Sequence, residues 1–204
     1  FSNSLKNFRI SNLQQKINYF NNLKVDFVIT KKFDKDFSKT KSINFIEKIL
    51  DKKLKAKFIF VSNNFRFGNK REGDVKQLIK FENRCNYKII KPKPLSIKRK
   101  IISSSLIRNY LQNGRINEVN KLLDRNWSII GKVQKGKQLG KKIGFPTANI
   151  DIKNYVLACP GVYSVIAKIG KNLNTIKGIA NLGYRPTFKG KKLNANKGIA
   201  NLGY

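Results

Sequence analysis

Apolar residues recur at every third or fourth position over residues 12–23, and this spacing predicts an amphipathic helix. Ser11 precedes the helix and is its predicted N-cap. The apolar stripe consists of Leu13, Ile17, Phe20 and Leu23. Such a stripe is typical of a helix that packs one face against a core.

Helical and strand-like segments alternate over the following residues. Short apolar runs predict strands at 25–29, 57–61 and 87–90, and helical spacing predicts helices at 42–52 and 74–84. An alternation of this kind predicts a parallel α/β layer.

The pattern changes after about Leu123, where helical spacing ends and glycines become frequent. Runs typical of β-structure occupy residues 128–133 and 162–169. Short strands between glycine turns favour a small antiparallel barrel or sandwich. We therefore expect two domains, with a boundary near residue 124.

The composition is that of a globular protein. The 204 residues are 40% apolar, which is enough for packed cores. No apolar run is long enough to span a bilayer and the first twenty residues lack a signal-peptide core, so we expect a cytoplasmic protein without a membrane partner. Cys85 and Cys159 stand far apart and the chain has no histidine, which leaves almost no zinc ligands.

The formal charge of +33 would by itself suggest a nucleic-acid partner. Only nine of the 44 basic residues are arginine, and the lysines are spread along the whole chain. A nucleic-acid reader tends to gather arginines and aromatics on one surface. The pattern therefore argues against dedicated nucleic-acid binding, and a basic RNA-associated module is kept only as an alternative.

Residues 131–149 combine glycines and lysines with the run Phe-Pro-Thr-Ala-Asn. Glycines allow backbone amides to approach an anion, and lysines beside them supply positive charge. Thr147 and Asn149 offer hard oxygen ligands for a magnesium ion. The run predicts a phosphate-binding loop, although on its own it also fits a solvated basic hairpin.

This run resembles the nucleotide loop of riboflavin kinases, G-x-V-x-x-G-x-x-x-G-x-x-x-G-F-P-T-A-N, at every fixed position. Residues 160–163 and 181–188 resemble two later segments of that family, Pro-Gly-Val-Tyr and N-x-G-x-R-P-T-F. The resemblance implies that Mg²⁺ is held by Thr147 and Asn149. It implies that ATP is held by Gly136, Lys137, Gly140, Lys141, Lys142, Gly144, Pro146 and Thr147.

Two further motifs occur in the first half of the chain. Asn64-Phe65-Arg66-Phe67-Gly68 follows a predicted strand, at the edge where open α/β sheets bind ligands. Ser103, Ser104 and Ser105 lie at a predicted helix N-terminus with Arg108 one turn along, an arrangement that suits a phosphate. Taken alone, the phenylalanines could equally anchor a loop to the core, and the serines could merely cap a helix.

Both motifs are similar to signatures of FAD synthetases, F-R-F-G and S-S-T-x-I-R, with Asn64 where many members have aspartate. The resemblance implies that residues 64–68 help to hold flavin and that Ser103–Ser105 and Arg108 hold ATP. Residues 122–125 resemble the family's L-L-G-R junction, and Asp124 in place of glycine costs little if that position needs no positive φ.

Together the motifs resemble the bifunctional bacterial riboflavin kinase and FAD synthetase family. This implies an α/β nucleotidyltransferase-like (Rossmann-like) parallel-sheet domain over 1–124, followed by a small antiparallel β-barrel riboflavin kinase domain over 125–204. The implied function is phosphorylation of riboflavin to FMN with ATP and adenylylation of FMN to FAD. The substrates would be riboflavin, FMN and ATP.

The chain departs from the family pattern in its catalytic groups. It has no histidine for the H-x-G-H motif of adenylyltransferases and no acidic residue after Asp151 to act as a kinase base, so no catalytic residue is identifiable. It begins at Phe1, and residues 190–204 repeat residues 170–184 at twelve of fifteen positions. We expect both domains to be incomplete and this chain to be inactive as written. The alternative is a non-catalytic flavin- or nucleotide-binding remnant.

Overall fold

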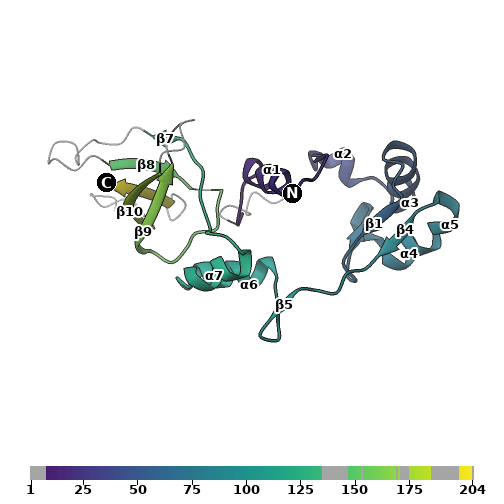
Figure 1. Cartoon of the computed structure of the whole chain (residues 1–204). Helices are drawn as coiled ribbons and strands as arrows, with labels where there is room; N and C mark the ends of the chain where they lie inside the picture. Colours follow the sequence, from purple (N-terminus) through teal and green to yellow (C-terminus); the bar gives the residue numbers. More distant parts are fainter. Residues whose placement is uncertain are drawn as a thin grey trace. The chain divides into compact units, whose positions relative to one another are not determined.

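The protein forms two compact units in the computed structural model (Figure 1), which describes residues 8–134, 147–152, 154–168, 170, 175–184 and 198–203. The central unit is Phe27–Ile101, and the terminal unit joins Phe1–Asp26 to Ile102–Tyr204. The first helix therefore belongs to the same unit as the C-terminal sheet. The compact units divide the chain at other places than the family boundary expected near residue 124.

The central unit contains a parallel pair of strands, β1 (Phe58–Phe60) and β4 (Lys88–Ile90), in the register Phe58↔Lys88 to Phe60↔Ile90. This confirms the strands predicted at 57–61 and 87–90. Two antiparallel ribbons accompany them: β2 (Arg66–Phe67) with β3 (Gly73–Asp74), and β5 (Ser96–Ile97) with β6 (Lys100–Ile101). The helical segments are α2 (Lys35–Ser38), α3 (Ser42–Asn44), a π-helix (Phe45–Lys53), a 3-10 turn (Asn69–Arg71), α4 (Val75–Lys80) and α5 (Glu82–Cys85).

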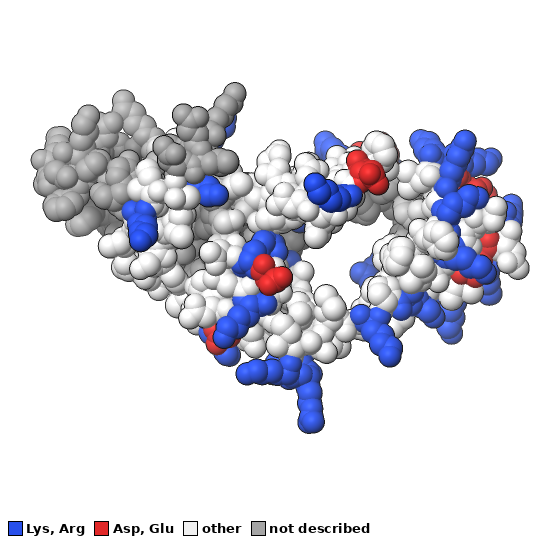
Figure 2. Space-filling model, in the orientation of Figure 1, with Lys and Arg blue, Asp and Glu red and all other residues white. Residues whose placement is uncertain are grey.

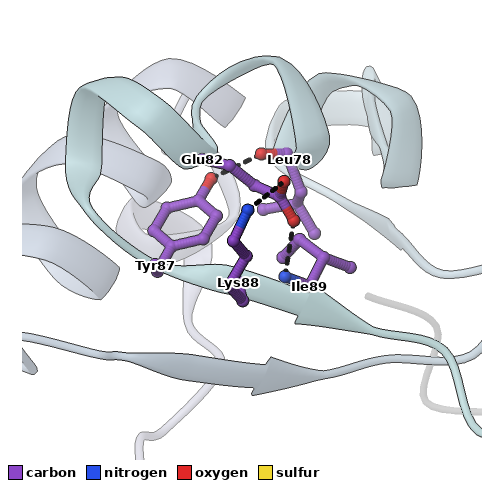
Figure 3. A network of polar contacts seen from close by, with 5 residues as sticks. All are labelled: Leu78, Glu82, Tyr87, Lys88 and Ile89. Carbon is purple, nitrogen blue, oxygen red and sulfur yellow. Dashed lines mark hydrogen bonds and ion pairs between the residues drawn. The ribbon is translucent and has the colours of Figure 1, made fainter.

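The core of the central unit is a cluster of buried side chains from both helices and strands: Ile46, Phe67, Leu78, Cys85 and Tyr87. Tyr87 also makes a polar contact inside this cluster, because its hydroxyl donates to the Leu78 carbonyl at 2.7 Å (Figure 3). Burial raises the pKa of this hydroxyl, so it stays protonated and able to donate at neutral pH. The bond fastens α4 to the start of β4.

The strand predicted at residues 25–29 is wrong, because the structure has no strand there. Phe27 and Ile29 are 85% and 73% exposed. A β-favouring run becomes a strand only when a neighbour pairs with it, and no described strand pairs with this one.

Both helices predicted in the central unit are present in altered form. The helix predicted over 42–52 changes from α to π geometry at Phe45. The helix predicted over 74–84 is divided at Phe81 into α4 and α5. Asp74 is the N-cap of α4, and its carboxylate accepts from the Gln77 amide at 2.9 Å.

In the terminal unit, α1 spans Leu13–Asn22 and confirms the first predicted helix. Its N-cap is Asn12, so the prediction of Ser11 is wrong. The Asn12 side chain accepts from the Gln15 amide at 2.8 Å, and the Gln15 side chain accepts from the Asn12 amide at 2.9 Å. This reciprocal capping box satisfies two backbone N–H donors. A cap at Ser11 would stand one residue too early in the sequence to make the same pair of bonds.

The polar residue Gln15 anchors α1, whereas much of the predicted apolar stripe is exposed. Gln15 is 2% exposed, while Leu13 and Leu23 are 51% and 73% exposed. The Gln15 side chain donates to the carbonyl and hydroxyl of Ser128 at 3.0 Å and accepts from the Tyr155 hydroxyl at 2.8 Å. The Tyr155 hydroxyl also accepts from the Ile130 amide at 3.1 Å. Hydrogen bonds across more than a hundred residues of sequence thus hold α1 in the terminal unit.

Two helices, α6 (Ser104–Gln112) and α7 (Ile116–Leu123), pack through one cluster of buried side chains: Ile107, Leu111, Val119 and Val156. Asp124 ends α7 in a left-handed conformation with φ of +51°. Aspartate would cost little here only if the position needed no positive φ, and that condition is not met. Aspartate nevertheless tolerates positive φ better than most residues.

The rest of the terminal unit is a five-stranded antiparallel sheet in the order β7-β8-β11-β10-β9. Its strands are β7 (Val133–Gln134), β8 (Thr147–Asp151), β9 (Gly161–Lys168), β10 (Thr175–Tyr184) and β11 (Gly198–Gly203). The antiparallel arrangement and the strand predicted at 162–169 are confirmed. Among the described strands, β7 and β9 do not pair with each other, so the sheet is open.

The strand predicted over residues 128–133 is wrong for most of its length, because β7 begins only at Val133. Trp127 and Ile129 instead pack against the buried cluster around Ile152 and Tyr155. The Ile130 amide donates to the Tyr155 hydroxyl, which takes the place of a strand partner. Among the described helices of both units, none has the length and apolar character needed to cross a membrane.

Replacing Tyr87 by phenylalanine removes the hydroxyl that donates to Leu78. We expect Tyr87→Phe to lower the free energy of unfolding of the central unit by about 1 kcal/mol, because one buried hydrogen bond is lost without a large cavity. Faster amide hydrogen exchange over residues 75–90 would report this loss. Tyr110→Phe is the matched control, since the Tyr110 hydroxyl has no hydrogen-bond partner among the described residues. Equal exchange in Tyr87→Phe and the parent protein would contradict the assignment.

Candidate functional site

The phenylalanines of the Asn64–Gly68 segment serve as its anchor in the central unit. The segment begins just after the carboxyl end of β1, as predicted. Phe67 is 7% exposed and lies 5.4 Å from the ring of Phe45, and Phe65 stacks on Phe67 at 5.6 Å. Of the two interpretations that the sequence left open, the structure supports the core-anchoring role for Phe67.

Gly68 brings the end of this segment against the start of α3. It has φ of +77° and ψ of 178°, a conformation almost restricted to glycine. A Cβ atom on Gly68 would lie 2.8 Å from the backbone of Ser42. The next residue, Asn69, donates its amide to the Thr40 carbonyl at 2.8 Å, and Glu72 accepts from the Ser42 amide at 2.7 Å. The glycine is needed for this close approach.

The polar side chains of the same segment remain accessible. Arg66 lies opposite Asp74 across the β2–β3 ribbon, with 3.8 Å between the guanidinium and the carboxylate. Its side chain is 47% exposed, so this ion pair is a weak one. Asn64 is exposed and accepts from the Ser62 hydroxyl at 2.9 Å. Arg66 and Asn64 are therefore the groups of this motif that a ligand could reach.

The serine motif lies at the N-terminus of α6 in the terminal unit, as predicted. Ser103 is the N-cap, and its hydroxyl accepts from the Leu106 amide at 3.2 Å. Ser104 and Ser105 are exposed in the first turn. The Arg108 guanidinium donates through Nε to the Phe8 carbonyl at 2.8 Å and lies over the Phe8 ring. These contacts hold Arg108 in place near an end of the helix where backbone amides are free to bind an anion.

Thr147 and Asn149 lie on the same face of β8, because alternate residues of a strand share a face. Asn149 pairs with Gln134 of β7, and the Gln134 side chain donates to the Asp151 carboxylate at 3.4 Å. Sequence reasoning missed Gln134 and Asp151 as neighbours of the two predicted ligands. Their proximity follows from strand register, which the sequence does not reveal.

The donor set on this face of β8 suits a hard cation. Thr147, Asn149 and Asp151 all present oxygen atoms, the ligand type that Mg²⁺ prefers. No group of three or more His, Cys, Asp or Glu residues able to hold a metal occurs in the described part of the chain. An ion at this face would therefore have one carboxylate, from Asp151, beside the hydroxyl oxygen of Thr147 and the amide oxygen of Asn149.

The remaining predicted ATP ligands of the glycine-lysine loop fall outside the described residues: Gly136, Lys137, Gly140, Lys141, Lys142, Gly144 and Pro146. The motifs whose geometry is described are each assembled within a single unit. Residues 64–68 belong to the central unit, and Ser103–Ser105, Arg108 and β8 belong to the terminal unit.

A surface cavity of about 430 Å³ in the central unit is lined by none of the motif residues. Its lining comes from the strands and α5: Lys57, Phe58, Glu82, Asn83, Asn86, Tyr87 and Lys88. The Glu82 carboxylate accepts from the Ile89 amide at 2.7 Å and lies 3.8 Å from the Lys88 ammonium (Figure 3). These contacts fasten β4 to α5, so Glu82 is a structural carboxylate.

Basic side chains occur on the described parts of both units, with few acidic ones among them (Figure 2). The positive charge is therefore not confined to one element. This agrees with the even spread of lysine along the sequence.

Comparison with known proteins gives matches to both parts of the chain. Residues 1–106 match the family described as FAD synthetase, and residues 123–200 match the family described as riboflavin kinase. Curated relatives carry the name bifunctional riboflavin kinase/FMN adenylyltransferase. The protein of Buchnera aphidicola subsp. Schizaphis graminum is 38% identical over 181 residues, which are 88% of this chain and 58% of the relative.

The proteins of Haemophilus influenzae and Escherichia coli K12 are 36% and 35% identical over 182 residues, or 89% of this chain. The chain spans 59% and 58% of their lengths. A crystal structure titled macrolide-efflux protein from Streptococcus pneumoniae aligns with a TM-score of 0.72 over 95% of this chain and 66% of that one. At 22% identity this likeness shows the fold alone.

The close approach of Gly68 to Ser42 predicts that alanine is not tolerated at this position. We expect Gly68→Ala to destabilise the central unit by about 1–3 kcal/mol, because the new Cβ meets backbone and the φ is unfavourable. Hydrogen exchange over residues 40–75 measures this effect.

Gly170→Ala is the control for conformation without contact, since Gly170 has φ of +69° and a Cβ atom added there would have nothing within 4 Å. Its effect should be limited to about 1 kcal/mol. Equal losses in the two variants would show that the contact with Ser42 contributes nothing.

Proposed function

The chain belongs to the FAD synthetase family and continues into a riboflavin kinase region, and we propose that it comes from an enzyme that makes flavin nucleotides. In the proposed first reaction, the ATP γ-phosphate passes to the terminal hydroxyl of riboflavin and gives FMN and ADP. In the second, the FMN phosphate attacks the α-phosphorus of ATP and gives FAD and pyrophosphate. The observation that carries this proposal is the presence of the two family regions in this order on one chain.

The proposed architecture follows the family. Residues 1–124 would be the nucleotidyltransferase region with a Rossmann-like parallel sheet, and β1 with β4 supplies a parallel pair for it. Residues 125–204 would be the kinase region with a β-barrel, for which the antiparallel sheet of β7 to β11 provides the strands. The relatives are longer than this chain, so the complete activity is proposed for the protein that contains it.

For adenylylation, we assign the ATP phosphates to the N-terminus of α6. The Ser103 hydroxyl is engaged in capping, which leaves Ser104 and Ser105 with exposed hydroxyls. Arg108 adds positive charge and is positioned by its bond to Phe8. Flavin would meet Asn64 and Arg66, while Phe65, Phe67 and Gly68 maintain the shape of the segment.

For phosphorylation, we assign ATP to the glycine-lysine loop of residues 136–146 and to Thr147. Thr147 and Asn149 would hold Mg²⁺, which would neutralise phosphate charge when bound. The oxygen donors on the shared face of β8 fit this role.

The chain has no histidine and no acidic residue after Asp151. We therefore expect these 204 residues to bind flavin or MgATP without turnover. The same observation favours, as a second candidate, a binding protein without catalysis. Turnover by the longer protein that contains this sequence would decide in favour of the enzyme.

The assignment of Ser104 and Ser105 predicts a specific loss of nucleotide affinity. We expect the double variant Ser104→Ala/Ser105→Ala to weaken ATP binding at least about tenfold, because even one hydrogen bond to a charged phosphate is worth roughly 1.5–3 kcal/mol. Titration calorimetry with ATP measures this, and Ser96→Ala on β5 is the matched surface control. An unchanged affinity would show that ATP does not bind at the N-terminus of α6.

The assignment of Asn149 predicts a loss that depends on magnesium. Asn149→Ala should weaken ATP binding in the presence of Mg²⁺ and leave binding in EDTA almost unchanged, because only the metal ligand is removed. Asn154→Ala, at an exposed asparagine outside the sheet, is the control. Failure of the longer protein that contains this sequence to bind either flavin or MgATP in a fluorescence titration would refute the proposed function itself.

A further inference from the structure

The strands β10 and β11 carry the same sequence. Residues 177–184 and 197–204 both read Lys-Gly-Ile-Ala-Asn-Leu-Gly-Tyr. The structure places Ile179–Tyr184 of the first copy and Gly198–Gly203 of the second side by side as antiparallel neighbours in one sheet. The repeat thus provides a strand together with its own pairing partner.

The register of this pairing has two-fold symmetry. Asn181 lies opposite Asn201, its counterpart in the second copy, and forms the centre of the pairing. On either side, Ala180 pairs with Leu202 and Leu182 pairs with Ala200. Each of these pairs joins an alanine to a leucine, and the two pairs differ only in which copy supplies the alanine. Two identical strands therefore meet in an isologous arrangement, the kind that joins the subunits of symmetric dimers.

Each strand also has a second neighbour with a defined register. β10 pairs with β9 along the pairs from Thr175↔Lys168 to Leu182↔Gly161. β11 pairs with β8 along the pairs from Ile199↔Asp151 to Gly203↔Thr147. On β10, Ala180 and Leu182 are each 6% exposed, so the strand contributes to the buried face of the sheet. Backbone pairing on both sides thus defines the position of β11 between β8 and β10.

We propose that two copies of this chain associate by exchanging β11, so that β11 of one copy lies between β8 and β10 of the other. A strand from another copy has the same sequence and makes the same backbone hydrogen bonds in the same register. The two arrangements differ only in the entropy of chain closure within one molecule and the entropy of association between two. Raising the protein concentration therefore favours exchange. The partner is a second copy because it supplies the same octapeptide, which already pairs symmetrically with β10.

Light scattering after size-exclusion chromatography tests the association on the unmodified chain. The protein is refolded from denaturant over a series of concentrations, since exchange of an inner strand requires the sheet to open. We expect the mass to rise from the 23.4 kDa of one chain to about twice that value as concentration increases. A mass of one chain at every concentration overturns the proposal.

Disulfide trapping tests the exchanged strand itself. Two chains of different tag length, one with Asn181→Cys and the other with Asn201→Cys, are refolded together and oxidised. Directly opposite residues of antiparallel strands have Cα atoms about 4.5–5.5 Å apart, within reach of a disulfide. We expect a cross-linked species that contains one chain of each length.

The matched control mixes Lys177→Cys with Asn201→Cys. Lys177 is four residues from Asn181 along β10, roughly 13 Å away, which is too far for a disulfide to Asn201 of the strand in the slot. Cys85 and Cys159 are present in both mixtures and contribute equally. A dimer that gives no more mixed cross-link in the test pair than in the control would use another surface and would overturn the proposal.

Discussion

The buried hydroxyl of Tyr155 holds the terminal unit together. It joins Gln15 of α1 to Ile130 in the segment before β7, and Gln15 continues the network to Ser128. An unpaired polar group in such a place would be costly, so each of the three segments stabilises the placement of the other two. Burial raises the pKa of the Tyr155 hydroxyl and thereby keeps its proton available for donation. Because of this network, α1 belongs with the C-terminal sheet although the FAD synthetase match begins with residue 1.

In each candidate motif, some residues maintain the local structure and others remain accessible to a ligand. In the flavin motif, Phe67 and Gly68 are committed to packing, and Arg66 remains in reach of solvent. In the serine motif, the Ser103 hydroxyl is committed to the cap of α6, and Ser104 remains exposed. The amino-acid sequence of a motif does not by itself distinguish these two roles. Burial and hydrogen bonding do, and they indicate which substitutions should affect binding without affecting folding.

Sequence reasoning succeeded where the signal is local and failed where tertiary contacts decide. The apolar spacing over residues 12–23 and the runs around β1 and β4 identified their elements. The run at 25–29 has the same local signal as β1 but no pairing partner among the described strands, and Gln15 is buried because Tyr155 and Ser128 come to it from far along the chain. The same holds for the candidate sites. The motifs could be recognised in the sequence, whereas the contact between Asp151 and Gln134 depends on the pairing register of β7 and β8.

The left-handed end of α7 bears on how this sequence can change over evolution. One base change turns a glycine codon into an aspartate codon, and aspartate is among the few residues that occupy positive φ at a cost of about 1 kcal/mol. A β-branched residue at Asp124 would be far less tolerated. Substitution at the end of the helix is therefore restricted by backbone conformation, while the buried Val119 within the same helix is constrained by its packing. Residues that tolerate positive φ, such as glycine, asparagine and aspartate, should therefore be the ones found at this position.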